Sequence, residues 1–105
     1  MEIYIYKQEL EGVLDIEKYC LDNNIDAEKV TSLICGTNKL TELKGLDKLV
    51  NLKRLYCHNN KLTDIKGLEK LVNLRRLICD DNYLTELQGL DKLVNLKWLY
   101  CHNNK

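Results

Sequence analysis

Residues 40–61 read LTELKGLDKLVNLKRLYCHNNK, residues 62–83 read LTDIKGLEKLVNLRRLICDDNY, and residues 84–105 read LTELQGLDKLVNLKWLYCHNNK. The first and third copies differ only at Lys44/Gln88 and Arg54/Trp98. Upstream, residues 30–39 (VTSLICGTNK) match the second half of one more copy. A fixed period of 22 residues is typical of a solenoid, in which each repeat buries its apolar side only by stacking on its neighbours.

The copies share the spacing L-x-x-L-x-C-x-x-N-x-L, seen for example in Leu52, Leu55, Cys57, Asn60 and Leu62. This spacing resembles the leucine-rich repeat, with cysteine in the third apolar position. The leucines that follow resemble the 22-residue repeats of internalins and of the phosphatase-regulator type, and the resemblance covers about residues 26–105. It implies an α/β repeat protein: a right-handed solenoid with a parallel β-sheet on its concave face and a helical N-terminal cap.

The local pattern explains how one repeat folds. Leu55 and Cys57 alternate with Tyr56, which predicts a short strand, and successive strands pair in parallel about 4.8 Å apart. A glycine in each full copy predicts a tight bend on the return path: Gly45, Gly67 and Gly89. An asparagine follows each strand, and these side chains are predicted to form a ladder that satisfies backbone groups in the turn: Asn38, Asn60, Asn82 and Asn104.

Residues 1–29 lack the repeat signature and are predicted to cap the first repeat. Asp15 is a suitable N-cap for a short helix over about residues 15–23, with Ile16, Tyr19 and Cys20 on one face. The alternation in residues 3–6 indicates a short strand. The remaining chain is divided into a half unit, 30–39, and three full units, 40–61, 62–83 and 84–105.

Composition narrows the functional classes. The 105 residues suffice for one domain, and 16 basic residues balance 16 acidic ones. The longest apolar run is too short to span a membrane, and the N-terminus has no signal-peptide pattern. Five cysteines, four of them at the repeat period, indicate free thiols in a reducing compartment, so the expected location is cytoplasmic.

The strand residues that point away from the core are the candidate binding residues. The expected function is protein–protein recognition through this concave face, whose Tyr, Trp and Arg residues are typical of binding hot spots. The candidates are Arg54, Tyr56, His58, Arg76, Ile78, Asp80, Trp98, Tyr100 and His102. A structural interpretation stays open, because Tyr56, Ile78 and Tyr100 would also stack across the strands and stabilise the sheet.

A second functional hypothesis concerns the C-terminal repeat, for which the sequence offers no cap. Leu96, Leu99 and Cys101 would then lie at an uncovered sheet edge, where a twofold dimer through residues 96–105 could form. The chain would in that case be a structural or assembly protein. The near-identity of the copies fits a recent duplication or an engineered scaffold, and the missing cap also fits a trimmed protein.

Single-stranded nucleic acid is a less favoured partner. Five cations lie near the strand starts, beside Trp98 and Tyr100: Lys53, Arg54, Arg75, Arg76 and Lys97. Asp80, Asp81 and the zero net charge oppose nucleic-acid binding.

Catalytic and metal chemistry is not expected. Cys57 and His58 are neighbours in a strand, so they point to opposite faces and cannot share a metal ion. His58, Asp80 and His102 fall in one row, where Asp80 could hydrogen-bond a histidine and make a contact pH-sensitive. The sequence carries no phosphate loop or nucleophile motif, so we expect neither enzymatic activity nor a cofactor.

Overall fold

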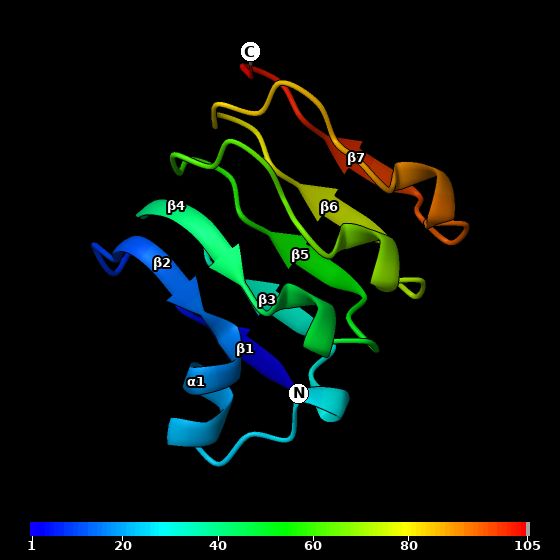
Figure 1. The fold of residues 1–105 in the computed structure, drawn as a ribbon. Helices are drawn as coiled ribbons and strands as arrows, with labels where there is room; N and C mark the ends of the chain where they lie inside the picture. The colour runs from blue at the N-terminus through cyan, green and yellow to red at the C-terminus, as the bar shows by residue number, and fades with distance from the viewer. Residues whose placement is uncertain (105) are drawn as a thin grey trace.

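The computed structural model describes residues 1–104; Lys105, the last residue of the predicted unit 84–105, lies outside them. Five parallel strands of three residues each form one sheet (Figure 1). In spatial order they are β1 (Glu2–Tyr4), β3 (Ser32–Ile34), β5 (Arg54–Tyr56), β6 (Arg76–Ile78) and β7 (Trp98–Tyr100). The central residue of each strand pairs with the next, which aligns Leu33, Leu55, Leu77 and Leu99. The predicted solenoid with a parallel sheet is confirmed.

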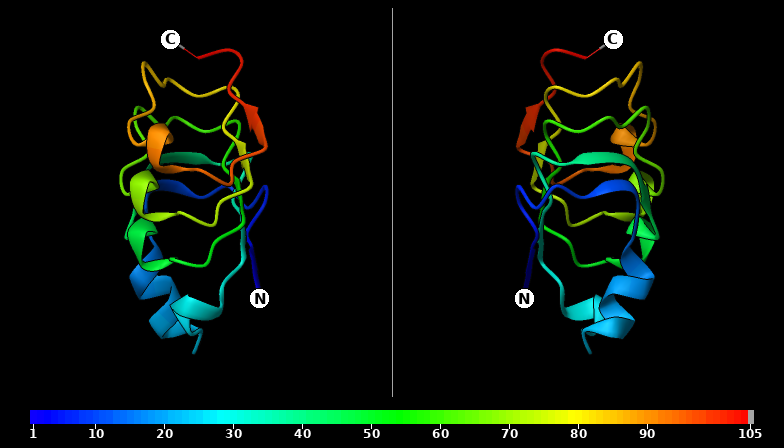
Figure 2. Two further views of the ribbon diagram at one scale, coloured as in Figure 1. Left: turned by 90° about the vertical axis from the view of Figure 1, so that its right-hand side faces the viewer. Right: turned by 90° about the vertical axis from the view of Figure 1, so that its left-hand side faces the viewer.

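Short 3-10 turns stack on the side opposite the sheet, as Figure 2 shows. They are η2 (Leu46–Lys48), η3 (Leu68–Lys70) and η4 (Leu90–Lys92), and η1 (Ala27–Lys29) precedes β3. The glycine before each of η2, η3 and η4 has a positive φ, between 83° and 90°. The predicted bends are therefore confirmed, and they return the chain over the core.

The helix predicted near residues 15–23 is present as α1 (Ile16–Asp22). The Asp15 side chain accepts a hydrogen bond from the Lys18 backbone N–H at 3.1 Å, which satisfies one free donor of the first turn. Ile16 and Cys20 are buried, and Asn23 is the C-cap of the helix. It packs against η2 and β4 (Lys39–Lys44).

The backbone of residues 1–29 follows the path of a repeat, although its sequence does not fit the repeat. Ile3 pairs with Leu33, and the Lys7 N–H donates to Gly36 O as the Thr37 N–H donates to His58 O. Lys7 and Thr37 even share a positive φ, 52° and 55°. The short strand predicted over residues 3–6 is present in part as β1 (Glu2–Tyr4). The repeat-like path was not predicted, because isoleucines replace the leucine and cysteine of the signature. Nor was β2 (Glu11–Asp15), which pairs in parallel with β4.

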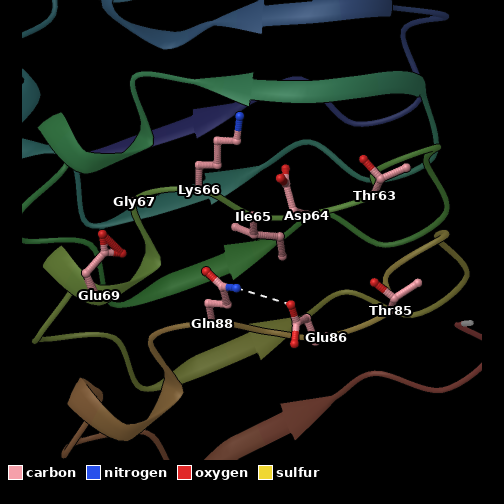
Figure 3. Close-up of a pocket in the computed structure, with 9 residues that line it drawn as sticks. All are labelled: Thr63, Asp64, Ile65, Lys66, Gly67, Glu69, Thr85, Glu86 and Gln88. Atoms are coloured by element: carbon pink, nitrogen blue, oxygen red, sulfur yellow. Dashed lines mark hydrogen bonds between the residues drawn. The ribbon is translucent and has the colours of Figure 1, made fainter.

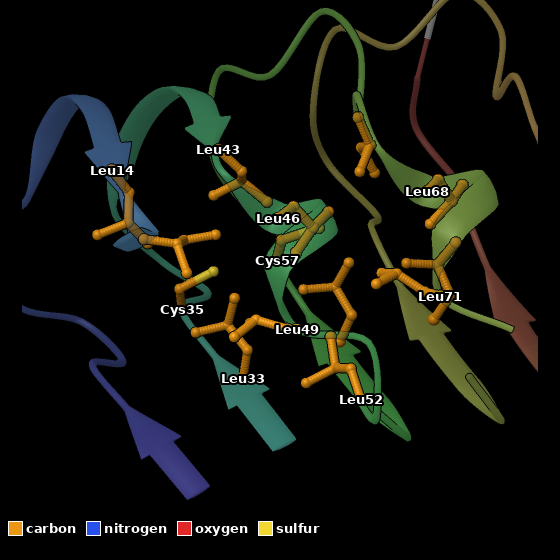
Figure 4. Close-up of a cluster of buried hydrophobic side chains, with 14 of the residues drawn as sticks. Leu14, Leu33, Cys35, Leu43, Leu46, Leu49, Leu52, Cys57, Leu68 and Leu71 are labelled. Carbon is orange, nitrogen blue, oxygen red and sulfur yellow. The ribbon is translucent and has the colours of Figure 1, made fainter. Parts of the chain in front are cut away.

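The core is a stack of leucines and cysteines between the sheet and the 3-10 turns (Figure 4). Cys35, Cys57 and Cys79, in the third apolar position of the repeat, are fully buried. Cys101 is exposed, in agreement with the uncovered edge predicted for the C-terminal repeat. The reason is that Cys101 follows β7, the edge strand of the described sheet. Leu99, the central residue of β7, is likewise 39% exposed, whereas the equivalent Leu77 of β6 is completely buried.

The predicted asparagine ladder is present. Asn60 Nδ2 donates to the carbonyl oxygens of Cys35 and Cys57, both at 3.1 Å, and Asn60 Oδ1 accepts from the Leu40 N–H at 3.0 Å. Asn82 and Asn104 repeat this pattern one and two units later. Asn38 extends it into the first turn by accepting from the N–H groups of Gln8 and Leu10 and donating to Ile5 O. One side chain per repeat thus joins that repeat to the preceding one.

Replacing Asn60 by leucine should lower the free energy of unfolding by at least about 3 kcal/mol. The change leaves several buried backbone groups without partners, and each such group costs about 1–3 kcal/mol. Urea denaturation measures the loss. Asn73→Leu is the control, because Asn73 Nδ2 reaches Val50 O and Asn51 Oδ1 only at 3.5 Å near the surface. Equal losses for the two variants would contradict the ladder's role.

Gly67→Ala should destabilise the protein more than Gly12→Ala. Both glycines have positive φ, 88° and 76°, which costs an L-residue about 1–2 kcal/mol. A Cβ at Gly67 would also lie 3.1 Å from the backbone nitrogen of Asp47, whereas a Cβ at Gly12 would meet nothing within 4 Å. Urea denaturation should therefore give a lower free energy of unfolding for Gly67→Ala than for Gly12→Ala. A reversed order would show that the repeat spacing tolerates the added methyl group.

Candidate functional site

The outward surface of the five-stranded sheet is hereafter called the sheet face. Strand register brings most of the predicted candidates into two rows across it. Arg54 pairs with Arg76, and Arg76 with Trp98; Tyr56, Ile78 and Tyr100 form the next row in the same way. The predicted rows are thus present, and each runs at right angles to the strands.

In the first row, the side chain of Arg76 packs on the ring of Trp98. The Arg76 guanidinium carbon lies 4.3 Å from the centroid of the Trp98 ring, a cation–π contact. Trp98 occupies one of the two positions at which the first and third copies differ. The difference therefore places a ring where it orders the arginine of the preceding repeat.

The central row is longer than predicted, because β1 adds Tyr4 beside Ile34. Tyr4 is 58% exposed and Tyr100 is 45% exposed, so the row carries an exposed ring at each end. Ile34 is buried, and Tyr56 and Ile78 are half-buried. Tyr6 follows β1 and lies 6.2 Å from Tyr4 between ring centroids. The alternation of Ile3 and Ile5 with these tyrosines was the signal that could have placed both on the sheet face.

The residues that follow the strands, His58, Asp80 and His102, make a third row. Their side chains do not form the predicted hydrogen bond between Asp80 and a histidine ring. The His58 ring lies over Gly36, where an added Cβ would be 2.4 Å from its Cε1 atom, and its centroid is 6.1 Å from that of Tyr6. Asp80 Oδ1 accepts from the backbone N–H of His102 at 2.7 Å. The carboxylate therefore binds a strand-end amide, and the considered bond to a histidine ring is not formed.

Cations gather at the beginning of the strands. The N–H groups of Lys53 and Arg54 both donate to Thr31 O, and this arrangement recurs for the pairs 75–76 and 97–98 in the next two repeats. We call Lys53, Arg54, Arg75, Arg76 and Lys97 the basic rim. Within residues 1–104, the one ion pair joins Lys18 to Asp22, so none of the rim cations has a carboxylate partner there.

Comparisons with known proteins agree with this geometry. The family model described as "Leucine Rich repeats (2 copies)" matches residues 28–70. Among solved structures, an internalin of Listeria monocytogenes superposes with a TM-score of 0.68 and 29% identity, over 73% of this chain and 23% of that chain. The chain thus carries leucine-rich repeats in an internalin-like fold. The matched part of the chain spans about a quarter of that internalin. The search of curated proteins found no match.

A hollow in the repeat stack lies away from the sheet face (Figure 3). It has a volume of about 340 Å³ and lies between the return segments of two successive repeats. Asp64, Glu69 and Glu86 line it, and Gln88 Nε2 donates to Glu86 Oε1 at 3.1 Å.

Within the described residues, no group of three or more His, Cys, Asp or Glu side chains could hold a metal ion. In the same part of the chain, no helix has the length and apolar character needed to cross a membrane.

The predicted dimer edge is partly accessible. Leu96 is half-buried, while Leu99 and Cys101 are exposed. Leu99 and Cys101 line a mainly apolar hollow of about 250 Å³ together with Leu84, Leu87 and Leu90. This end of the repeat stack thus exposes core-type residues.

The buried cysteines are poor nucleophiles. Burial raises the pKa of Cys35 and of Cys79 to about 12, and it raises the pKa of Cys57 well above the ordinary value of 9.0. Their thiols therefore remain protonated at neutral pH. This state fits apolar filling of the core.

The raised pKa values predict a loss of stability at alkaline pH. Between about pH 9 and pH 12 the thiols ionise in the unfolded chain but stay protonated in the folded one, so the free energy of unfolding falls as pH rises. Each buried thiol should contribute a slope of about 1.4 kcal/mol per pH unit in this window. Urea denaturation from pH 7 to pH 11 measures the slope, which should be smaller for Cys79→Ala.

Leu77→Ala is the matched control for that variant. Leu77 lies in β6 and is as fully buried as Cys79, but its side chain does not titrate. Leu77→Ala should therefore lower the free energy of unfolding at every pH without changing its slope against pH. Parallel curves for Cys79→Ala and the unmodified protein would contradict the assignment.

Proposed function

We propose that the sheet face binds a partner protein. Leucine-rich repeats generally mediate protein–protein interaction and are typically not enzymes. The observation that supports this surface is the exposure of three large aromatic side chains on it: Tyr4, Trp98 and Tyr100. Tyrosine and tryptophan supply much of the binding energy of interfaces because they bury large areas with few rotatable bonds.

The competing interpretation is that these rows only stabilise the sheet. Tyr56 and Ile78 support it, since both are half-buried between their cross-strand neighbours. Trp98 also has a packing role through Arg76. Packing alone does not require that the rings at both ends of the row stay open to water, and clustered exposed apolar surface is typical of interaction sites.

The frame beneath the face favours binding as well. Leu55 and Leu77 are completely buried directly under it, and the asparagine ladder fixes the turns that follow the strands. A partner therefore meets side chains whose backbone is already ordered. Such preorganisation lowers the entropic cost of association.

Replacing Trp98 and Tyr100 together by alanine should weaken partner binding by about 30-fold or more, the effect of losing a hot spot of about 2 kcal/mol. The test captures proteins from a nuclease-treated lysate of the source organism on the unmodified and the substituted chain. A partner retained by the first and lost by the second is then purified, and its Kd is measured for both.

Val72→Ala/Val94→Ala is the control, since both valines are exposed and follow the 3-10 turns on the other side of the molecule. This variant should bind normally. Circular dichroism must show that the substituted chains remain folded. Equal binding by a folded Trp98→Ala/Tyr100→Ala chain would reject the sheet face as the interface.

A second candidate function is self-association through the edge at β7. The observation that favours it is the exposure of Leu99 at a position that is completely buried in the preceding repeat. A second copy seated there would cover Leu96, Leu99 and Cys101.

Leu99→Lys should abolish this association, because a charged side chain would have to be buried in the contact. Sedimentation velocity over a 100-fold concentration range (~1–100 μM, spanning the affinities of ordinary weak dimers) should show dimers of the unmodified chain and monomers of the variant. A mass that stays monomeric for the unmodified chain would exclude the hypothesis.

A further inference from the structure

Charge is segregated along the strands of the sheet face. The basic rim lies where the strands begin, and Asp80 and Asp81 lie where β6 ends. The chain as a whole is neutral, with 16 residues of each sign, so this polarity comes from position alone. Glu2 stands at the β1 end of the rim's row, two strands away from Arg54.

A hollow of about 370 Å³ adjoins the rim at this end. It is lined by Met1, Glu2, Thr31, Ser32, Lys53 and Arg54. Ser32 is 6% exposed, and its hydroxyl oxygen has no hydrogen-bond partner within the described residues. A buried hydroxyl without a partner is costly unless a ligand or water satisfies it. The hydroxyl therefore adds a polar group beside two cations, a combination suited to a carboxylate.

The rim also runs parallel to the apolar central row. Arg54 and Tyr56 are two residues apart in one strand and so point to the same side, about 6.6 Å apart along the strand. Across the strands, the central row from Tyr4 to Tyr100 extends over four strand spacings, or about 19 Å. An extended peptide covers that distance with about six residues.

From these features we propose that the partner contributes an extended acidic segment that lies across the strands. Its carboxylates contact the basic rim, and its apolar or aromatic side chains lie on the central row. Asp80 and Asp81 repel carboxylates from the opposite side and so set which edge of the segment faces the rim. This inference rests on the proposed function of the sheet face and specifies the partner's chemistry.

Arginine is well suited to this contact. Its planar guanidinium can hold a carboxylate through two parallel hydrogen bonds, which lysine cannot do. The Trp98 ring already restrains the Arg76 guanidinium at 4.3 Å. Less side-chain freedom is then lost when a carboxylate binds.

The same surface is less suited to single-stranded nucleic acid. Such strands bind by stacking successive bases on aromatic rings beside a cationic groove. Here Ile34 and Ile78 alternate with the tyrosines of the central row, so adjacent bases would not find adjacent rings. The carboxylates of Asp80 and Asp81 would also face the phosphates.

The test is a selection from a phage-displayed library of random 12-residue peptides. The baits are the unmodified chain, the charge-reversed variant Arg54→Glu/Arg76→Glu, and Lys48→Glu/Lys70→Glu. The last variant is the matched control, because it reverses two exposed cations of the same two repeats on the 3-10 side. Lys53→Glu/Lys97→Glu serves as a second rim variant that leaves the Arg76–Trp98 contact in place. Fluorescence polarisation then gives Kd for a synthetic selected peptide.

The unmodified chain and the control should enrich peptides that combine Asp or Glu with apolar residues. Each rim variant should weaken the selected peptide at least about tenfold, the effect of about 1.4 kcal/mol. Enrichment of neutral or basic peptides whose binding still requires Trp98 and Tyr100 would overturn the acidic segment and leave the proposed function standing. Peptides indifferent to Trp98→Ala/Tyr100→Ala, or no enrichment at all, would overturn both. Oligo(U) that binds tighter than the peptide would overturn the inference in favour of nucleic acid.

Discussion

The structure depends on one constraint: the backbone groups in the turn after each strand have no sheet partner and must be satisfied inside the stack. One asparagine per repeat does this, as Asn60 shows by bonding to Cys35 O, Cys57 O and the Leu40 N–H. Because Cys35 O belongs to the preceding unit, the side chain fixes one repeat on the next. The solenoid therefore propagates as long as each unit brings its asparagine to the same place, which is what a strict period of 22 residues achieves.

This constraint also positions the sheet face. Asn60 and Asn82 hold the turns that follow β5 and β6, and the register between those strands is then unshifted. Side chains at equivalent positions must lie next to each other, so any residue type that recurs with the repeat becomes a row. Rows of like residues on the sheet face are therefore a consequence of repetition. A residue type that occurs in one copy only interrupts such a row.

How much could be predicted follows from the same logic. Strands, bends and ladder recur, so their spacing revealed them, and Asp15 with the Ile16, Tyr19 and Cys20 pattern revealed α1. The first turn occurs once, with Gln8 where later repeats carry asparagine, and its backbone path could not be recognised. Tyr4 and Tyr6 were missed with it. The exposure of Cys101 followed from its place in the last copy, since no pattern within the repeat distinguishes it from the buried Cys79.

Repetition and departure from it have different consequences for binding. Cations recur at positions 53, 75 and 97 and again at 54 and 76, so the basic rim grows with every repeat. Asp80, Asp81 and Trp98 each occur in one copy only, where the others have His, Asn or Arg. Trp98 removes one cation from the rim but restrains another, Arg76. If the partner is acidic, as we propose, its attraction comes from the repeated positions. The choice among acidic partners comes from the single-copy residues, because these distinguish one repeat of the face from the next.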